Sequence, residues 1–234
     1  YVLFRGSERV VAVSQGLLTK LRDLGCKDAI YIPNCVKPRA VDMIGESVDR
    51  HHILFVGSLT RVKRPDILVQ AFHTVANQFQ DARLTIVGIG PMQQPLKKLV
   101  CELSLTRKVC LAGYLREEEL IQLYRRSSVF VLPSSMEGLS LSLLEAMSFG
   151  KRIIVSDSAN SGVIQHEVDG LIFRHDDVDD LARKLLWMLE NPEKSMRLSI
   201  NAKTKCEQQY SLEVVAPRLE RLYAEVLSQP TQIE

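Results

Sequence analysis

The sequence predicts a doubly wound α/β domain built on a parallel sheet. Short apolar runs rich in β-branched residues alternate with longer stretches whose apolar residues recur at i, i+3 and i+4. The short runs are apolar almost throughout, as expected for strands that are buried on both faces of a sheet. Alternation of this kind is typical of parallel sheets covered by helices on both sides.

Residues 1–35 form a separate strand–helix–strand unit ahead of the main repeat. Its strands are predicted at 10–13 and 29–32, and Ser14 stands where a helix N-cap belongs. Pro33 ends the second strand and opens a linker.

The main domain is predicted from about 36 to 210. Its strands are expected at 52–57, 83–88, 108–113, 128–133, 152–156 and 170–173. Its helices are expected at 64–79, 92–105, 116–127, 141–150 and 176–191. A further helix is predicted at 211–228, within a C-terminal segment of 211–234.

Composition excludes several classes of protein. Of 234 residues, 46% are hydrophobic and 25% are charged, which indicates a folded core rather than disorder. The net charge of +2 gives no sign of a general nucleic-acid binder, and no apolar run is long enough for a membrane span. The chain begins at Tyr1 rather than Met, and we expect it to be part of a longer protein.

Cysteine usage favours a reducing compartment. The five cysteines are odd in number, and no two have C-x-x-C spacing, so neither a disulfide framework nor a zinc site is expected. We therefore expect a cytoplasmic protein. Basic clusters such as Arg61, Lys63 and Arg64 allow peripheral contact with the anionic inner face of a membrane.

Several predicted strands end in glycine. In open α/β sheets, ligands lie beyond the carboxyl ends of the strands, and Gly57, Gly88, Gly90 and Gly113 follow three of these ends. Glycine lets the backbone come close to a ligand. The same glycines also suit tight strand-to-helix turns without any ligand.

The stretch EGLSLSLLE carries a glutamate at each end of seven uncharged residues. Glu137 lies in the loop, at or just before the start of a predicted helix, where the unpaired N–H groups of Gly138, Leu139 and Ser140 can bind an anion such as a diphosphate. Glu145 follows on the same helix and can accept hydrogen bonds from a ribose diol. Two plainer interpretations stay open: Glu145 belongs to a solvated stripe, and Glu137 only favours the helix dipole.

These motifs resemble a known family. PSSMEGLSLSLLEAMSFGKRIIVSD (133–157) resembles the E-x7-E region of the retaining glycosyltransferases of family four. ILFVGSLTRVKRPDILVQAF (53–72) is similar to the family's G-R-L-x-x-x-K segment, and LTIVGIGP (84–91) to its V-G-x-G-P loop. VCLAGYL (109–115) and the segments at both ends of the chain agree in order and spacing.

The resemblance implies a GT-B enzyme, in which two Rossmann-like domains face a cleft. Residues 36–210 correspond to the C-terminal donor-binding domain, and residues 1–35 to the end of the N-terminal acceptor domain. Residues 211–234 correspond to the helix that crosses back between the domains, followed by the tail.

The resemblance also assigns roles to particular residues. It implies that Glu137 contacts hydroxyls of the donor sugar and that Glu145 binds ribose. It implies that Lys63 binds the diphosphate and stabilises the leaving group. The backbone at Tyr114 and Leu115 lies where the base commonly binds, although plain packing explains Tyr114 equally well.

Ser58 departs from the family pattern. The family often has a phosphate-binding arginine at this position, so one positive charge is missing here. Arg61 is near enough in the sequence to replace that arginine.

The resulting expectation is a retaining glycosyltransferase that uses a UDP- or GDP-sugar and no metal or other cofactor. The acceptor is expected to be a glycan, a lipid-linked glycan or a small molecule, and nucleic acid is not an expected partner. Asp177 and Asp179 form a D-x-D pair, but at a helix start they suit the dipole rather than a metal. Two alternatives stay open: a non-catalytic nucleotide-sugar-binding module, favoured by Ser58, and a sugar-nucleotide epimerase of the same fold.

Overall fold

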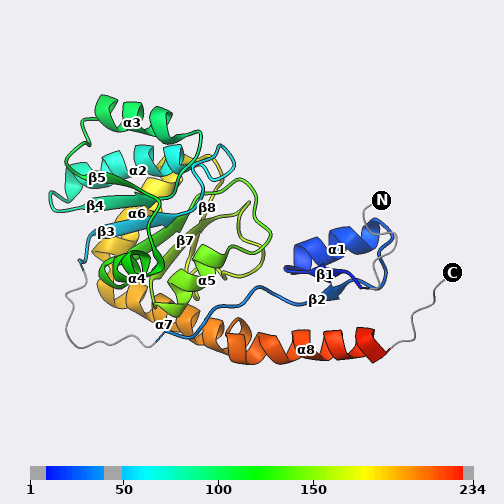
Figure 1. Cartoon of the computed structure of the whole chain (residues 1–234). Coiled ribbons are helices and arrows are strands. Elements are labelled where there is room, and N and C mark those ends of the chain that lie inside the picture. Colours follow the sequence, from blue (N-terminus) through cyan, green and yellow to red (C-terminus); the bar gives the residue numbers. More distant parts are fainter. Residues whose placement is uncertain (1–8, 40–48, 229–234) are drawn as a thin grey trace.

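The computed structural model describes residues 9–39 and 49–228, and within them it confirms the predicted doubly wound α/β fold. Six described strands form one parallel sheet in the order β5-β4-β3-β6-β7-β8 (Figure 1). The strands are β3 (His52–Val56), β4 (Arg83–Val87), β5 (Val109–Gly113), β6 (Val129–Leu132), β7 (Arg152–Ser156) and β8 (Leu171–Phe173).

The strand order reverses between β3 and β6. From β3 the chain adds β4 and β5 on one side, and it then returns so that β6 pairs with the other side of β3. The register there is Ile53 opposite Val129 and Leu54 opposite Phe130. The loops that follow β3 and β6 therefore part at this point, where α/β sheets of this kind bind their ligands.

Helices cover both faces of the sheet. The helices of the main domain are α2 (Pro65–Gln78), α3 (Gln93–Glu102), α4 (Glu117–Arg126), α5 (Leu141–Ser148), α6 (Val178–Glu190) and α7 (Pro192–Gln209). Residues of α2, α3 and α6 contribute to one buried cluster, and residues of α4, α5 and α7 to the other. Along β3 the side chains alternate between the clusters, because successive strand residues point to opposite faces.

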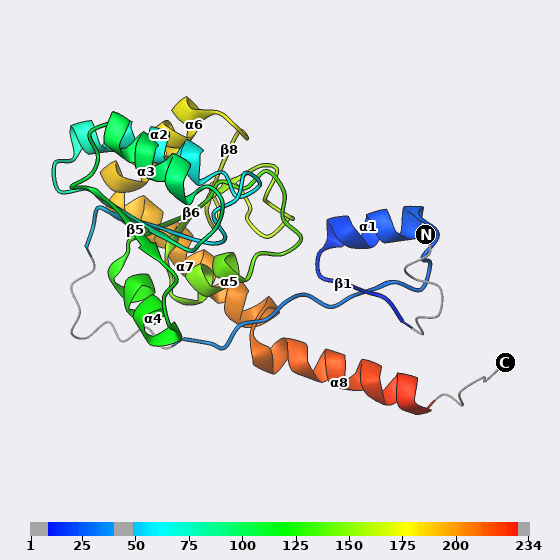
Figure 2. The ribbon, with the colours of Figure 1, turned by 45° about the horizontal axis from the view of Figure 1, so that its top comes forward.

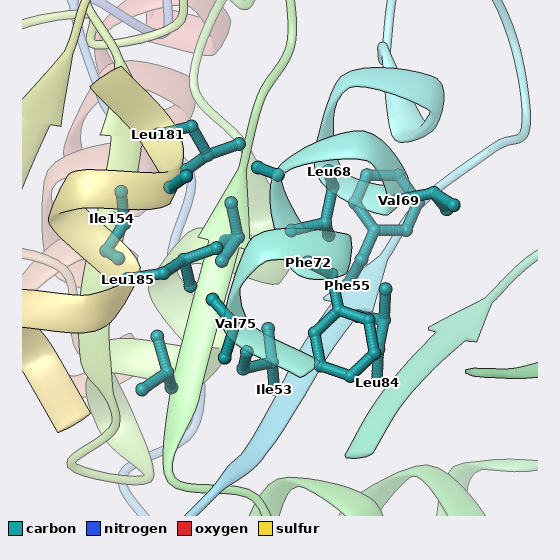
Figure 3. Packing of buried hydrophobic residues seen from close by; sticks show 14 of the residues in the cluster. Ile53, Phe55, Leu68, Val69, Phe72, Val75, Leu84, Ile154, Leu181 and Leu185 are labelled. Atoms are coloured by element: carbon teal, nitrogen blue, oxygen red, sulfur yellow. The ribbon is translucent and has the colours of Figure 1, made fainter. Parts of the chain in front are cut away.

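The first cluster is the larger of the two. Phe55 of β3 and Phe72 of α2 are fully buried in it, and so is Leu185 of α6, which lies near Ile154 of β7 (Figure 3). Burying one such side chain stabilises the fold by roughly 1.5–3 kcal/mol before entropy is counted. This packing holds α2, and with it the loop that precedes the helix, in place against the sheet.

Helix α7 is an element that the sequence patterns did not predict. It is polar overall, and several of its buried positions carry small residues, among them Ser195 and Ala202. Ser195 is fully buried, and its hydroxyl donates to the Asn191 carbonyl at 2.8 Å. Because a buried serine interrupts the apolar spacing, the amphipathic pattern of α7 is hidden in the sequence.

The N-terminal unit consists of β1 (Val11–Ala12), α1 (Gln15–Asp23) and β2 (Ile30–Tyr31), and its two strands pair in parallel. Ser14 caps α1, as predicted, because its Oγ accepts a hydrogen bond from the Leu17 N–H at 3.2 Å. The unit lies beside the main domain, with α8 along it (Figures 1 and 2).

Helix α8 (Leu212–Ser228) joins the two parts of the molecule. Its Val215 and Leu222 pack on Ile32, and Arg218 donates to the Tyr31 carbonyl at 2.8 Å. The division of the chain at residues 35 and 210 into the end of an acceptor domain, a donor domain and a crossing helix stays a prediction. Among the described residues, no helix combines the length and apolar character needed to cross a membrane.

Candidate functional site

The loops after β3 and β6 are joined at the switch point of the sheet. The Ser135 N–H donates to the Val62 carbonyl at 2.7 Å, and the Ser135 hydroxyl donates to the same oxygen at 3.1 Å. Two loops that leave adjacent strands are thus held together beyond the carboxyl end of the sheet.

Lys63 and Glu137, both predicted site residues, meet across these loops. Lys63 Nζ donates to Glu137 Oε1 at 2.5 Å, and the Ser134 hydroxyl donates to the same oxygen at 2.7 Å. The Glu137 side chain is only 9% exposed and that of Lys63 is 24% exposed. The Ser161 hydroxyl donates to the Glu137 carbonyl at 3.0 Å, so the backbone is also held. The carboxylate of Glu137 does more than complement the helix dipole, since it neutralises a lysine.

The start of α5 presents free hydrogen-bond donors. Ser140 caps the helix by accepting from the Leu143 N–H at 3.4 Å. Within residues 9–39 and 49–228, the N–H groups of Gly138, Leu139 and Ser140 donate no hydrogen bond. The Leu139 carbonyl points elsewhere, since it accepts from Asn34 Nδ2 at 2.8 Å. These N–H groups are available for an anion, with the positive end of the helix dipole behind them.

Glu145 is half-buried one turn further along α5. Its Oε2 accepts a hydrogen bond from the Tyr124 hydroxyl at 2.9 Å. Burial raises the pKa of Glu145, while the Tyr124 hydrogen bond and the charge of Arg39 act in the opposite direction. The solvated-stripe interpretation does not fit, because Ser148 on the same side is only 2% exposed.

The glycines after β3 and β4 have a packing role. Gly88 has φ of +135°, and a Cβ there would lie 1.9 Å from the Gly57 carbonyl oxygen. A Cβ on Gly90 would lie 2.5 Å from the Leu59 carbonyl oxygen. The two loops can pack this closely only with glycine at these positions. Donor contacts at Gly57, Gly88 and Gly90 stay a prediction.

The other predicted site residues do not take part in the contacts of Lys63, Glu137 and Glu145. Ser58 and Arg61 are exposed in the loop after β3, and Tyr114 is 76% exposed after β5. Leu115 packs against the second buried cluster. No hydrogen bond or ion pair in the described part of the chain joins Arg61 or Tyr114 to Lys63, Glu137 or Glu145.

The D-x-D pair opens a helix, as predicted. Asp177 is the N-cap of α6, and its Oδ1 accepts from the Asp180 N–H at 2.8 Å. Among residues 9–39 and 49–228, no three or more His, Cys, Asp or Glu side chains are grouped so that they could hold a metal ion.

Sequence reasoning missed four residues that support the site: Asn34, Tyr124, Ser134 and Ser161. Tyr124 occupies an apolar position of a predicted helix, so its pattern indicated packing alone. The serines stand in loops, where their hydroxyls carry no signal of a partner. Tyr124 meets Glu145 through the packing of α4 on the same face as α5, and the other three meet their partners through the folding of the loops.

The fold and the site together define a doubly wound α/β protein with a lysine, a glutamate and a helix start with unpaired N–H groups at its switch point. Residues 38–205 match the model of the family "Glycosyl transferases group 1". That match covers more than half of the chain, and the chain belongs to this family.

Named relatives agree with this assignment. An uncharacterized glycosyltransferase of Methanocaldococcus jannaschii is 30% identical over 181 residues, covering 77% of this chain and 46% of that protein. The N-acetyl-alpha-D-glucosaminyl L-malate synthase of Bacillus anthracis is 27% identical over 233 residues, covering 94% of this chain and 60% of that protein. The chain thus spans about half the length of the curated relatives it matches.

A solved structure shares the fold. The pneumococcal O-GlcNAc transferase GtfA, in complex with UDP and GlcNAc, has a TM-score of 0.84 and is 17% identical. The match covers 95% of this chain and 46% of that chain. The expected GT-B type of fold is confirmed by this likeness.

Proposed function

We propose that this chain is the donor-binding part of a retaining glycosyltransferase that uses a nucleoside-diphosphate sugar. The observation that carries the proposal is the meeting of Lys63 and Glu137 at the switch point, beside the free N–H groups of Gly138, Leu139 and Ser140. One cation and several dipoles face the place where a diphosphate would lie. Retention of configuration rests on the family resemblance.

Lys63 and the start of α5 would hold the diphosphate. As the bond to the sugar breaks, negative charge grows on the departing nucleoside diphosphate. A lysine and oriented N–H groups that are already in place stabilise that charge without reorganising. Because these groups supply positive charge themselves, we propose that the reaction needs no metal ion.

The two glutamates would hold the ends of the donor. Glu137 would exchange its ion pair with Lys63 for hydrogen bonds to the sugar hydroxyls when the diphosphate claims the lysine. Glu145 would accept hydrogen bonds from the ribose hydroxyls, and backbone groups near Tyr114 and Leu115 would contact the base. Arg61, exposed beside Lys63, would add the charge that Ser58 lacks.

The donor class is tested by calorimetric titration of the chain with UDP, GDP and ADP, each with and without magnesium. We expect one nucleotide to bind clearly better, and magnesium to make no difference. UDP is the first candidate, since the fold neighbour GtfA was solved with UDP and GlcNAc. Loss of binding in both Lys63→Ala and Glu145→Ala would support the site, and unchanged binding in both would overturn it.

Sugar transfer itself requires the acceptor domain, which would form the other side of the cleft. Both reactants must be held in line, and we expect residues 1–234 alone to bind donor without efficient turnover. We propose that the full-length protein transfers the sugar to a glycan, a lipid-linked glycan or a small-molecule acceptor. Following the anomeric proton of the product by NMR distinguishes retention from inversion.

Exposed Ser58 favours a second candidate function, a nucleotide-sugar-binding module without catalysis. This module would bind the same nucleotide but show no turnover in the full-length protein with any acceptor. An epimerase of the same fold would alter the sugar in the absence of acceptor, so a product assay without acceptor separates it from both.

A further inference from the structure

Tyr124 is a buried polar residue that the proposed function has not used. It lies on α4 and is only 1% exposed. Its hydroxyl donates to Glu145 Oε2 at 2.9 Å and also lies 3.2 Å from the Ser142 carbonyl oxygen. A side chain of α4 is thus hydrogen-bonded to Glu145 of α5, the carboxylate proposed to bind ribose.

The ring of Tyr124 is held firmly. It stacks on Phe149 with ring centroids 5.1 Å apart and an interplanar angle of 7°. The Arg39 guanidinium lies 5.7 Å from the Phe149 centroid and pairs with Glu117 of α4 at 3.0 Å. A phenol fixed in this way has little freedom to turn its hydroxyl away from Glu145.

The chemistry of the pair leaves room for a ligand. A carboxylate offers about four acceptor positions on its two oxygens. The Tyr124 hydroxyl occupies one position on Oε2, so Oε1 and the remaining position on Oε2 stay available. Burial, together with the neighbouring Glu145, raises the pKa of Tyr124 well above its usual value. The hydroxyl therefore remains a donor throughout the neutral range.

We propose that Tyr124 is a positioning residue for the donor nucleotide: its hydroxyl orients the Glu145 carboxylate toward the ribose diol and so sets the preference for ribonucleotides over deoxyribonucleotides. The inference rests on the proposed function of Glu145. It adds a residue that never touches the ligand, and it names the property that this residue controls.

The test is Tyr124→Phe, which removes one oxygen and keeps the ring. Binding of UDP, GDP and ADP, of their 2′-deoxy forms and of inorganic pyrophosphate is measured by calorimetry for wild type and variant. We expect the preferred ribonucleotide to bind about three- to tenfold more weakly, the range for one hydrogen bond. Its 2′-deoxy form, which keeps only the 3′-hydroxyl, should lose less affinity, and pyrophosphate should be unchanged.

Tyr210→Phe is the matched control. Tyr210 is also buried, and its hydroxyl is hydrogen-bonded to Tyr31 rather than to Glu145. It should leave the ratio of ribonucleotide to deoxyribonucleotide affinity unaltered. A purely structural role for Tyr124 would instead weaken all ligands by one common factor, and that result would overturn the inference.

A double-mutant cycle with Glu145→Gln provides a second readout. Since Tyr124 acts through Glu145, adding Tyr124→Phe to Glu145→Gln should not lower the ribose preference further. If Tyr124→Phe does not fold, Phe149→Leu replaces it, because this change loosens the stack while keeping both polar groups. An unchanged ribose preference in the folded variant overturns the inference alone. No binding of any nucleotide by the wild type overturns the proposed function together with it.

Discussion

At the residue scale, the two proposed catalytic side chains are paired with each other in the free protein. Lys63 and Glu137 form a short ion pair, and Ser134 adds a hydrogen bond to the same carboxylate oxygen. On the proposed function, a diphosphate would have to compete with Glu137 for the lysine. The pair keeps a nearly buried carboxylate neutralised in the free protein.

Glu137→Gln should separate diphosphate binding from sugar binding. Without the competing charge, we expect UDP to bind about three- to tenfold more tightly. A UDP-sugar should gain less, and transfer by the full-length protein should fall, because the sugar hydroxyls lose a carboxylate. Calorimetry and turnover assays check both signs.

Glu167→Gln is the control for that change, since Glu167 is an exposed glutamate in a loop beyond the site. UDP affinity that is unchanged or weaker in Glu137→Gln would show that Glu137 does not compete for Lys63.

The raised pKa of Glu145 predicts that the free energy of unfolding depends on pH. Burial raises its pKa in the folded protein above the ordinary value of 4.5. The folded state then holds more protons than the unfolded state, so this group's contribution falls as pH rises from about 4.5 through the folded pKa.

We therefore expect Glu145→Gln to raise the melting temperature at neutral pH while weakening nucleotide binding. The difference from wild type should grow above pH 4.5 and then level off, as measured by thermal unfolding at a series of pH values. Exposed Glu102→Gln should show no such trend. A Glu145→Gln variant that is less stable at neutral pH would indicate a structural rather than a binding role.

At the element scale, the turn after β4 is shaped by contact between loops. Gly88 and Gly90 pack against the backbone of the β3 loop, and the Leu59 N–H donates to the Ile89 carbonyl at 2.9 Å. These turns hold the loop that carries Lys63. Gly88 and Gly90 of the predicted site thus have a packing function.

Gly88→Ala should destabilise the chain by more than about 2 kcal/mol, since it combines a clash with backbone that non-glycine residues rarely adopt. Gly16→Ala is the matched control, because a Cβ there meets nothing within 4 Å. It lies in helix α1 and should stabilise by about 0.4–1 kcal/mol. Urea denaturation measures both changes, and a neutral Gly88→Ala would contradict the packing.

At the scale of the whole molecule, α8 links the N-terminal unit to the main domain. Val215 and Leu222 bury their side chains against Ile32, while the start of the helix is tied to the linker by the hydrogen bond from the Leu212 N–H to the Val36 carbonyl at 2.9 Å. Asn34 of the same linker donates to the Leu139 carbonyl at the start of α5, but neither of these α8 contacts is made with a residue of α5. Docking of α8 and binding of nucleotide should therefore be separable.

Leu222→Asp should release α8 from the N-terminal unit, because an unpaired charge is costly to bury. We expect faster amide hydrogen exchange across 212–228 and nucleotide affinity within about twofold of wild type, since no contact at the site is lost. Tyr223→Asp, at an exposed neighbouring position, should change neither property. Loss of nucleotide binding in Leu222→Asp alone would show that α8 supports the site.

The sequence by itself determined the alternation of strands and helices, the parallel sheet and the start of α5 at Leu141. These features follow from local spacing of apolar residues and from capping, which neighbouring residues decide. The same local signals singled out Glu137 and Glu145. They failed for α7, where buried serines conceal the apolar face.

Only the tertiary structure decided which side chains meet. Lys63 and Glu137 are 74 residues apart, and they come together because β3 and β6 are neighbours in the sheet. Tyr124 reaches Glu145 because α4 and α5 pack on the same face. Such contacts depend on strand order and helix packing, and the spacing of residues along the chain carries no direct record of either.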